Sequence, residues 1–314
     1  MNTTNFIKKT VLLMGLASVF FLASCDKDDD DTPALQSITQ IVVNSPDFTI
    51  LEAAVVKAEL ATILETTPNL TVFAPNDAAF TAAGITLAVV NSKTKAELQA
   101  LLGYHVLTSL VPSTGVPAGP NAEVTTYSGG KVYATKNANG VFINGVKVVT
   151  ADVAAKNGII HIVDRVIVPP AGNIVATAQA TPSLSYLVAA VLRADASGTS
   201  ISGALSGAGP LTVFAPTNQA FIDAGFPTIA SINAADPNTL KNILLYHVIA
   251  ARVYSSDLTE GAQPTTQGGG KVTIKLAGGA KVRGISNTQD SNISITDITT
   301  TNGVVHVIDR VLLP

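Results

Sequence analysis

One stretch of the chain occurs twice, and this repeat constrains the fold more than any other feature. Residues 70–80 read Leu-Thr-Val-Phe-Ala-Pro-Asn-Asp-Ala-Ala-Phe, and residues 211–221 read Leu-Thr-Val-Phe-Ala-Pro-Thr-Asn-Gln-Ala-Phe. In each copy an apolar run stops at a proline, which cannot donate a hydrogen bond to a β-ladder. The residue that follows, Asn76 or Thr217, is a favoured helix N-cap. The repeat therefore predicts two copies of a strand–proline–helix unit.

Further paired features extend this correspondence along the chain. Each half contains a second predicted helix with a strong N-terminal signal, then a Tyr-His-Val block, and then a closing strand that follows an Asn-Gly turn. The closing strand is apolar on both faces, so we expect it to be central in its sheet. The pairs are the helix-ending glycines Gly84 and Gly225, the caps Thr94-Lys-Ala-Glu97 and Asp236-Pro237, the blocks 104–106 and 246–248, and the closing segments 157–169 and 302–314.

Length and composition agree with two globular domains. The chain has 314 residues, of which 47% are hydrophobic and 13% charged, and this is ample for two cores. We place the domains at 35–169 and 171–314. Between the paired blocks, segments 108–130 and 250–270 are rich in Gly, Pro, Ser and Thr and are predicted to be loops.

The N-terminus reads as a leader that ends at the single cysteine of the chain, Cys25. Lys8 and Lys9 precede an apolar stretch, 11–22, that is short for a membrane span. Leu22-Ala-Ser-Cys25 then resembles the lipobox of bacterial lipoproteins. The resemblance implies a signal peptide at 1–24 and a lipid on Cys25. The alternative is an ordinary secretory leader in which the cysteine is incidental.

Residues 25–34 form an acidic tether that contains Asp26-Lys-Asp-Asp-Asp-Asp31. Such a run is a solvated spacer on any interpretation. It also resembles the export signal that sends lipoproteins of Bacteroidota to the outer face of the outer membrane. In a proteobacterial host, aspartate directly after the cysteine would instead imply retention in the inner membrane. The resemblance implies a lipid-anchored protein of the cell envelope that faces outward.

The three repeated blocks resemble, in order, those of the fasciclin-like domain family. They are Leu-Thr-Val-Phe-Ala-Pro-Thr-Asn-x-Ala-Phe, Leu-x-x-Ile-Leu-x-Tyr-His-Val and Asn-Gly-Val-Val-His-Val-Ile-Asp-Arg-Val-Leu-x-Pro, and they cover both halves. The resemblance implies an α+β fold with two tandem domains, each a wedge or sandwich of about seven strands with short helices packed on it. Family members are mostly secreted or membrane-anchored adhesion and matrix proteins.

All four histidines, His105, His161, His247 and His306, lie in the repeated blocks beside apolar residues. This doubling favours histidines whose hydrogen bonds are satisfied inside each core over a metal or catalytic site. In matrix relatives the Tyr-His block is implicated in integrin contacts. The resemblance carries that partner-binding role to Tyr104, His105, Tyr246 and His247, although their apolar neighbours favour burial.

The remaining candidate motifs do not indicate an enzyme. The residues of each pair Asp164-Arg165 and Asp309-Arg310 should point to opposite faces of a strand, which argues against an ion pair. The run Gly268-Gly-Gly-Lys271 fails the phosphate-loop pattern, and neither a nucleophile elbow nor a zinc-protease motif occurs. We therefore expect no catalytic residue, cofactor or metal. The net charge of −3, without basic clusters, also argues against nucleic acid as a partner.

The two predicted loops differ most between the halves, and loops on a rigid scaffold are where binding residues concentrate. We therefore assign partner contacts to Tyr127 in one loop and to Arg252 and Tyr254 in the other. The predicted function is adhesion, or interaction with an extracellular protein or glycan, by a lipid-anchored surface protein. The alternative is a ligand- or polysaccharide-binding accessory of an outer-membrane uptake system, and a hydrolase comes third.

Overall fold

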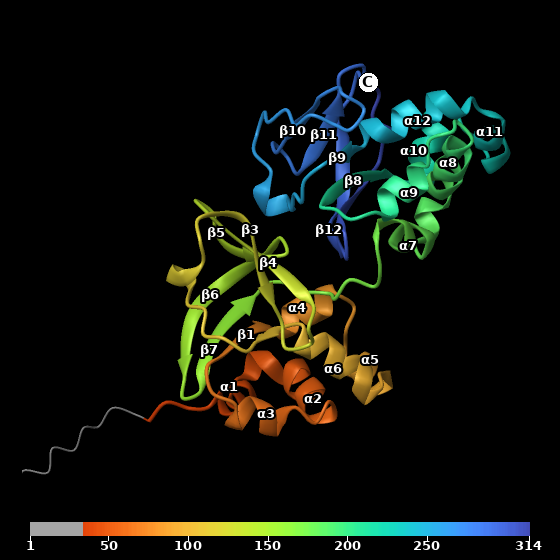
Figure 1. Cartoon of the computed structure of the whole chain (residues 1–314). Helices are drawn as coiled ribbons and strands as arrows, with labels where there is room; N and C mark the ends of the chain where they lie inside the picture. Colours follow the sequence, from red (N-terminus) through yellow and green to blue (C-terminus); the bar gives the residue numbers. More distant parts are fainter. Residues whose placement is uncertain (1–33) are drawn as a thin grey trace, which may run out of the picture. The chain divides into compact units, whose positions relative to one another are not determined.

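Each half of the chain builds one sheet around a parallel pair of strands, with its helices gathered on one side (Figure 1). The computed structural model describes residues 34–314. The predicted signal peptide, Cys25 and nearly all of the acidic tether lie outside the described residues. None of the described helices is long and apolar enough to cross a membrane.

The first half contains a seven-stranded sheet with the order β2-β1-β7-β6-β5-β4-β3. Its helices are α1 (Ile38–Asn44), α2 (Thr49–Lys57), α3 (Ala61–Thr66), α4 (Asp77–Ala82), α5 (Leu87–Ser92) and α6 (Lys95–Gly103), with short 3₁₀ turns η1 (Pro46–Phe48) and η2 (Ser113–Gly115). Its strands are β1 (Leu70–Pro75), β2 (Val106–Leu107), β3 (Gly119–Thr125), β4 (Lys131–Asn137), β5 (Gly140–Ile143), β6 (Val146–Ala155) and β7 (Gly158–Val163).

The second half repeats this plan with a six-stranded sheet in the order β10-β11-β12-β13-β8-β9. Its helices are α7 (Ile174–Gln179), α8 (Ser185–Asp195), α9 (Ile201–Ser206), α10 (Asn218–Asp223), α11 (Ile229–Ala234) and α12 (Pro237–Tyr246), with 3₁₀ turns η3 (Pro182–Leu184) and η4 (Ser255–Asp257). Its strands are β8 (Leu211–Pro216), β9 (Val248–Ile249), β10 (Val272–Lys275), β11 (Lys281–Gly284), β12 (Ser291–Thr300) and β13 (Gly303–Ile308).

The repeated strand is buried on both faces because it separates two cores. In β1, Val72 and Ala74 belong to the core beneath the helices, whereas Phe73 belongs to a second core on the opposite face. In β8, Phe214 takes the same place in the second half. Since alternate side chains of a strand point to opposite faces, an unbroken apolar run is what such a strand requires. The prediction that the closing strand is central is also confirmed, because β7 lies between β1 and β6.

The predicted helix boundaries are confirmed in both halves. Asn76 and Thr217 cap α4 and α10 through their side-chain oxygens. Thr94 forms a capping box with Glu97 at the start of α6, and Asp236 caps α12 with proline at its first position. The helix-ending glycines adopt left-handed φ angles, +69° at Gly84 and +94° at Gly225.

One predicted loop is in part a strand. Within 108–130, residues Gly119–Thr125 form β3, which pairs with β4 at the edge of the first sheet. The glycine and proline that suggested a loop stand at the first two positions of this edge strand, where proline is tolerated. In the second half the corresponding pairing shrinks to a single bridge between Thr265 and Lys271, so the two halves do differ here.

Candidate functional site

Tyr104 and Tyr246 are core residues, each about 1% exposed. The Tyr104 hydroxyl donates to the carbonyl of Lys131 at 2.6 Å and accepts from the Asn144 amide at 3.2 Å. Burial raises the pKa of Tyr104 to about 12. The Tyr246 hydroxyl likewise donates to the carbonyl of Lys271. Both phenols therefore tie a helix end to the lysine at or just before the start of a strand, β4 or β10, and both rings are buried.

The tyrosines also explain the sequence Gly-Gly-Lys, which occurs at 129–131 and again at 269–271. Gly129 and Gly269 have φ angles of +83° and +87°, so each turn needs a residue that tolerates the left-handed region. A Cβ on Gly270 would lie 2.6 Å from Cε2 of the Tyr246 ring, and the same addition at Gly130 would lie 2.8 Å from Tyr104. The motif is thus a turn followed by a close contact with a tyrosine ring.

His105 and His247 are buried and hydrogen-bonded at both ring nitrogens. Nδ1 of His105 donates to the carbonyl of Leu101 at 2.8 Å, and Nε2 accepts from the N–H of Ile167 at 2.9 Å. Because a backbone N–H can only donate, this pattern requires a neutral ring. Burial lowers the pKa of both histidines to about 4. The prediction of satisfied core histidines is confirmed for this pair.

His161 and His306 are also buried, and each accepts a hydrogen bond from the backbone of an aspartate whose carboxylate binds a serine. Nδ1 of His306 accepts from the N–H of Asp297 at 3.3 Å, while Nε2 donates to the carbonyl of Val253 at 2.9 Å. Asp297 has a φ of +65° at an irregularity in β12, and its carboxylate accepts from the N–H and hydroxyl of Ser255. The first half repeats this arrangement with His161, Asp152 and Ser113. Neither cluster was predicted from the sequence.

A serine, a histidine and an aspartate in one cluster invite comparison with a catalytic triad, but the connections are wrong for one. In a triad the histidine accepts the proton of the serine hydroxyl. Here the hydroxyl of Ser255 donates to Asp297, and both nitrogens of His306 are held by backbone groups. The ring is fully buried, and burial lowers the pKa of His306. The cluster therefore fixes a strand irregularity to the start of a 3₁₀ turn.

The three loop residues assigned to partner contacts have different surroundings. Tyr127 is 46% exposed, whereas Tyr254 is fully buried. The guanidinium carbon of Arg252 lies 3.8 Å from the centroid of the Tyr133 ring, and its Nη1 donates to the carbonyl of Gly303. Of the seven side chains predicted to bind a partner, Tyr127 is therefore the most accessible, and the partner-binding role of the set remains a prediction.

The turn around η4 makes several hydrogen bonds to β3 and β4. Asp257 accepts from the hydroxyl of Thr135 at 2.9 Å, and the Asn121 amide donates to the carbonyl of Arg252 at 2.8 Å. Asn137 donates to the carbonyl of Ser256 at 2.8 Å. Part of segment 250–270 is thus engaged within the chain, which leaves less of it for an external partner than its loop-like sequence suggested.

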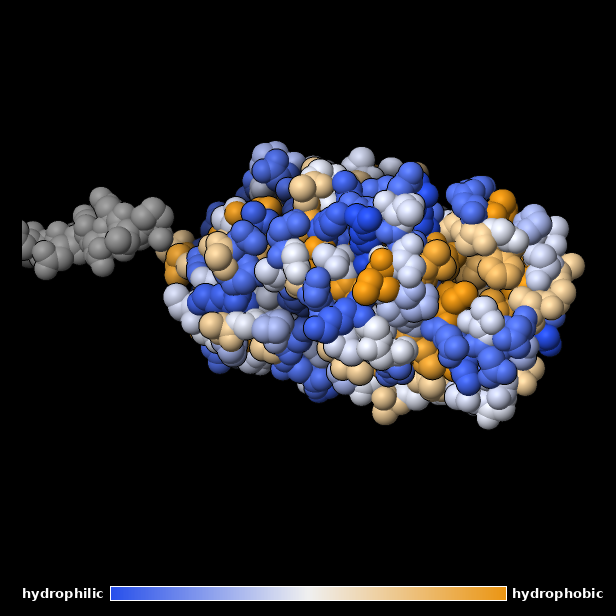
Figure 2. Space-filling view, turned by 90° about the horizontal axis from the view of Figure 1, so that it is seen from above, coloured by the Kyte–Doolittle hydropathy of each residue, from blue (hydrophilic) through white to orange (hydrophobic). Residues whose placement is uncertain are grey.

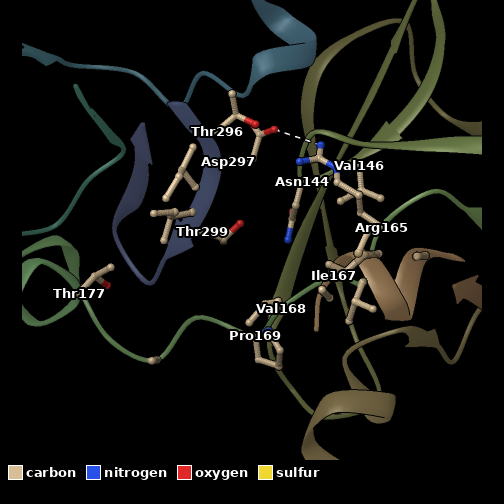
Figure 3. Close-up of a pocket in the computed structure, with 17 residues that line it drawn as sticks. Asn144, Val146, Arg165, Ile167, Val168, Pro169, Thr177, Thr296, Asp297 and Thr299 are labelled. Atoms are coloured by element: carbon tan, nitrogen blue, oxygen red, sulfur yellow. Dashed lines mark hydrogen bonds and ion pairs between the residues drawn. The ribbon is translucent and has the colours of Figure 1, made fainter. Parts of the chain in front are cut away.

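A cavity of about 470 Å³ is lined by apolar side chains and a few polar groups (Figure 3). Arg165 donates to Asp297 at 3.2 Å on the wall of the cavity, and Asn144, Thr296 and Thr299 add further polar atoms.

Arg165 also forms a long ion pair with its neighbour in sequence, since its Nε lies 4.0 Å from the carboxylate of Asp164. The expectation that these two residues form no ion pair is therefore wrong. Among the described residues, no group of histidine, cysteine, aspartate and glutamate side chains could hold a metal ion.

The fold and these sites define a class of protein: tandem α+β domains whose repeated polar residues serve the scaffold. A model of the fasciclin domain matches residues 46–169 and 183–314. The chain therefore belongs to the fasciclin domain family and carries two copies, called the first and second domain below.

Several relatives support this assignment. The chain is 30% identical over 280 residues to transforming growth factor-beta-induced protein ig-h3 of Sus scrofa, with 88% of this chain and 38% of the relative covered. It is 35% identical over 141 residues to the cell surface glycolipoprotein MPB83 of Mycobacterium bovis, with 45% and 60% covered. The chain thus spans well under half of the pig protein. Fasciclin domains occur in surface proteins, which fits a general interaction role.

Among solved structures, the chain is similar to a domain pair from the insect cell adhesion molecule fasciclin I. Sequence identity is 20% and the TM-score is 0.40, with 84% of this chain and 96% of that chain covered.

Proposed function

We propose that the chain is a lipid-anchored protein of the bacterial cell envelope, displayed outward on the outer membrane, which mediates adhesion by holding an extracellular protein or glycan. Leu22-Ala-Ser-Cys25 supports the lipid anchor, and the acidic run after it supports outward export. Membership of the fasciclin domain family supports the adhesive role.

One observation carries the proposal of a binding protein over that of an enzyme. The histidines and the aspartates nearest to them already form hydrogen bonds with backbone groups and neighbouring serines. A catalytic group needs a free lone pair or proton that faces a substrate. An outside partner would therefore contact the surface of the domains, where Tyr127 is an exposed aromatic side chain.

The test uses the full chain with Cys25→Ser, so that the protein is free of lipid, coupled to beads. Bead retention on surfaces coated with envelope and matrix extracts is measured under flow. We expect retention above that of bare beads, and we expect Tyr127→Ser to reduce it. Val56→Ser is the matched control, because Val56 is 61% exposed on a helix of the same domain. Retention equal to that of bare beads would contradict an adhesive role.

A second candidate function, ligand or polysaccharide binding for an uptake system, is favoured by the cavity of Figure 3. Its volume of about 470 Å³ and its mixture of apolar and polar walls suit a small ligand. Saturable binding of an oligosaccharide in calorimetry, lost in Thr296→Val, would favour this function over adhesion.

A further inference from the structure

The second domain has an apolar groove of about 250 Å³ between α7, α8, α9 and α12. Its walls include Val175 and Ala178 on α7, Val188 and Val191 on α8, and Leu244 on α12. Hydrophobic residues gather on the surface over this helical part, at the right of Figure 2. Leu192, which is 61% exposed, also lines the groove.

The same place in the first domain is filled. There the space between α1, α2, α3 and α6 is about 20 Å³. Equivalent hydrogen bonds show which residues of the two domains correspond here. The N–H of Ile38 donates to Asn157 and the N–H of Ile174 donates to Asn302, each at 3.0 Å, so Ile38 corresponds to Ile174. Four residues further along each helix stand Val42, which is buried, and Ala178.

The valine-to-alanine difference removes two methyl groups from the wall of the groove. The two domains also differ in the polarity of the residue at a second position. The N–H of Ile50 donates to Asp77 and the N–H of Tyr186 donates to Asn218, so these two residues correspond. Two residues later the first domain has Glu52 and the second has Val188. The groove is therefore wider than its counterpart in the first domain, and Val188 is one of the residues that line it.

The polar groups that line the groove select against a charged ligand. Ser202 donates its hydroxyl to Asp195, and both nitrogens of His247 are bonded to backbone groups. Gln179 is exposed and contributes a neutral amide. None of the described residues that line the groove carries a charge at neutral pH. A carboxylate or ammonium inside it would lose its hydration without gaining a partner.

We propose that this groove binds one uncharged aliphatic chain of about eight to ten carbon atoms. The chain length is scaled by volume, because an apolar cavity of about 150 Å³ holds a six-carbon ring. The polar end of the ligand lies at the opening, where the amide of Gln179 can hydrogen-bond to an ester or hydroxyl. The ligand class is a neutral medium-chain lipid such as a monoacylglycerol. The first domain, whose counterpart is filled, binds no such chain.

The probe is 1-decanoylglycerol below its micellar concentration, with the full Cys25→Ser chain. Calorimetry should give one molecule per chain, and bound ligand should raise the melting temperature by mass action. Glycerol should not bind because it has no aliphatic chain, and decanoate should bind about tenfold more weakly because no cationic residue lines the groove to pair with its carboxylate. Two molecules per chain, or equal affinity for decanoate, would overturn the proposal.

The matched variants exchange the two distinguishing residues for those of the first domain. The double variant Ala178→Val with Val188→Glu should lose about tenfold or more in affinity. Ile229→Ala, an exposed change on α11, should bind as the wild type does. Should the double variant fold poorly, methyl NMR of the wild type decides the question. Ligand-induced shifts confined to Val175, Val188 and Leu244 support the groove, whereas shifts elsewhere contradict it.

Discussion

His247 receives a hydrogen bond from the backbone N–H of Leu312 at 2.8 Å, through its Nε2. The ring joins the end of α12 to the last residues of the chain, 65 positions away in sequence. Because Nδ1 already donates to Ile243, a proton on Nε2 would face a donor, and the folded state requires a neutral imidazole. His105 makes the equivalent link to Ile167 in the first domain.

This relationship predicts that the protein loses stability in mild acid. The folded pKa of each of these histidines is about 4, below an unfolded value of about 6.5. The unfolded chain therefore binds more protons between these values, and the free energy of unfolding falls as pH drops from about 6.5 to 4. By pH 4 the loss is of order 3 kcal/mol for each histidine. Urea unfolding curves measured between pH 6.5 and 4 test this expected loss of stability.

His247→Gln provides the matching variant. Glutamine keeps one acceptor and one donor but does not titrate. The variant should therefore show a shallower decline of stability with falling pH than the wild type. If the free energy of unfolding falls equally steeply with pH in both proteins, His247 does not cause the loss of stability in acid.

Asn302 is predicted to be a large contributor to the stability of the second domain. Its Oδ1 accepts from Ile174, and its Nδ2 donates to the carbonyls of Leu205 and Gly207 at 2.9 and 2.8 Å. Asn302→Ala leaves these buried groups without partners and should cost about 2–4 kcal/mol. Asn233→Ala, on the exposed surface of α11, should change stability by less than about 0.5 kcal/mol in the same denaturant melts.

The contact of Gly270 with the Tyr246 ring predicts a second, steric effect. Gly270→Ala places a methyl group 2.6 Å from a buried ring carbon, so the ring or the turn must shift. We expect a cost of about 1–3 kcal/mol. Gly115→Ala is the control, because its new Cβ would meet Pro112 at an ordinary 3.4 Å. Thermal melts that show equal effects for the two substitutions would refute this account of the Gly-Gly-Lys motif.

Local signals made much of the fold predictable. The strand–proline–helix units, the caps at Asn76 and Thr217 and the helix-ending glycines depend on residues close together in sequence. Family resemblance supplied the α+β class. The edge strand Gly119–Thr125 was missed because its composition is that of a loop, and its partner strand decides its conformation.

The polar clusters could not be predicted because their partners are distant in sequence. Asn157 bonds to Leu64 and Thr67, more than 80 residues away. The left-handed φ of Asp152 has no local signal either, since an irregularity in the strand pairing creates it. The apolar groove depends on small differences, Val42 against Ala178 among them, and becomes visible when the two domains are compared in space.

The lipid anchor yields a direct biochemical prediction. Radiolabelled palmitate should enter the wild-type protein and be absent from Cys25→Ser, since the lipobox-like segment places the lipid on this sulfur. Immunoblots must show equal amounts of both proteins. Equal labelling of the two would show that the anchor, if present, lies elsewhere.

The most direct test of the whole account measures adhesion of living cells. Cells that produce the wild-type chain, Cys25→Ser, or no chain are compared for attachment to extracellular matrix or to neighbouring cells under flow. We predict strong attachment with the wild type alone, with the Cys25→Ser protein released into the medium. Equal attachment of cells with and without the chain would contradict the account.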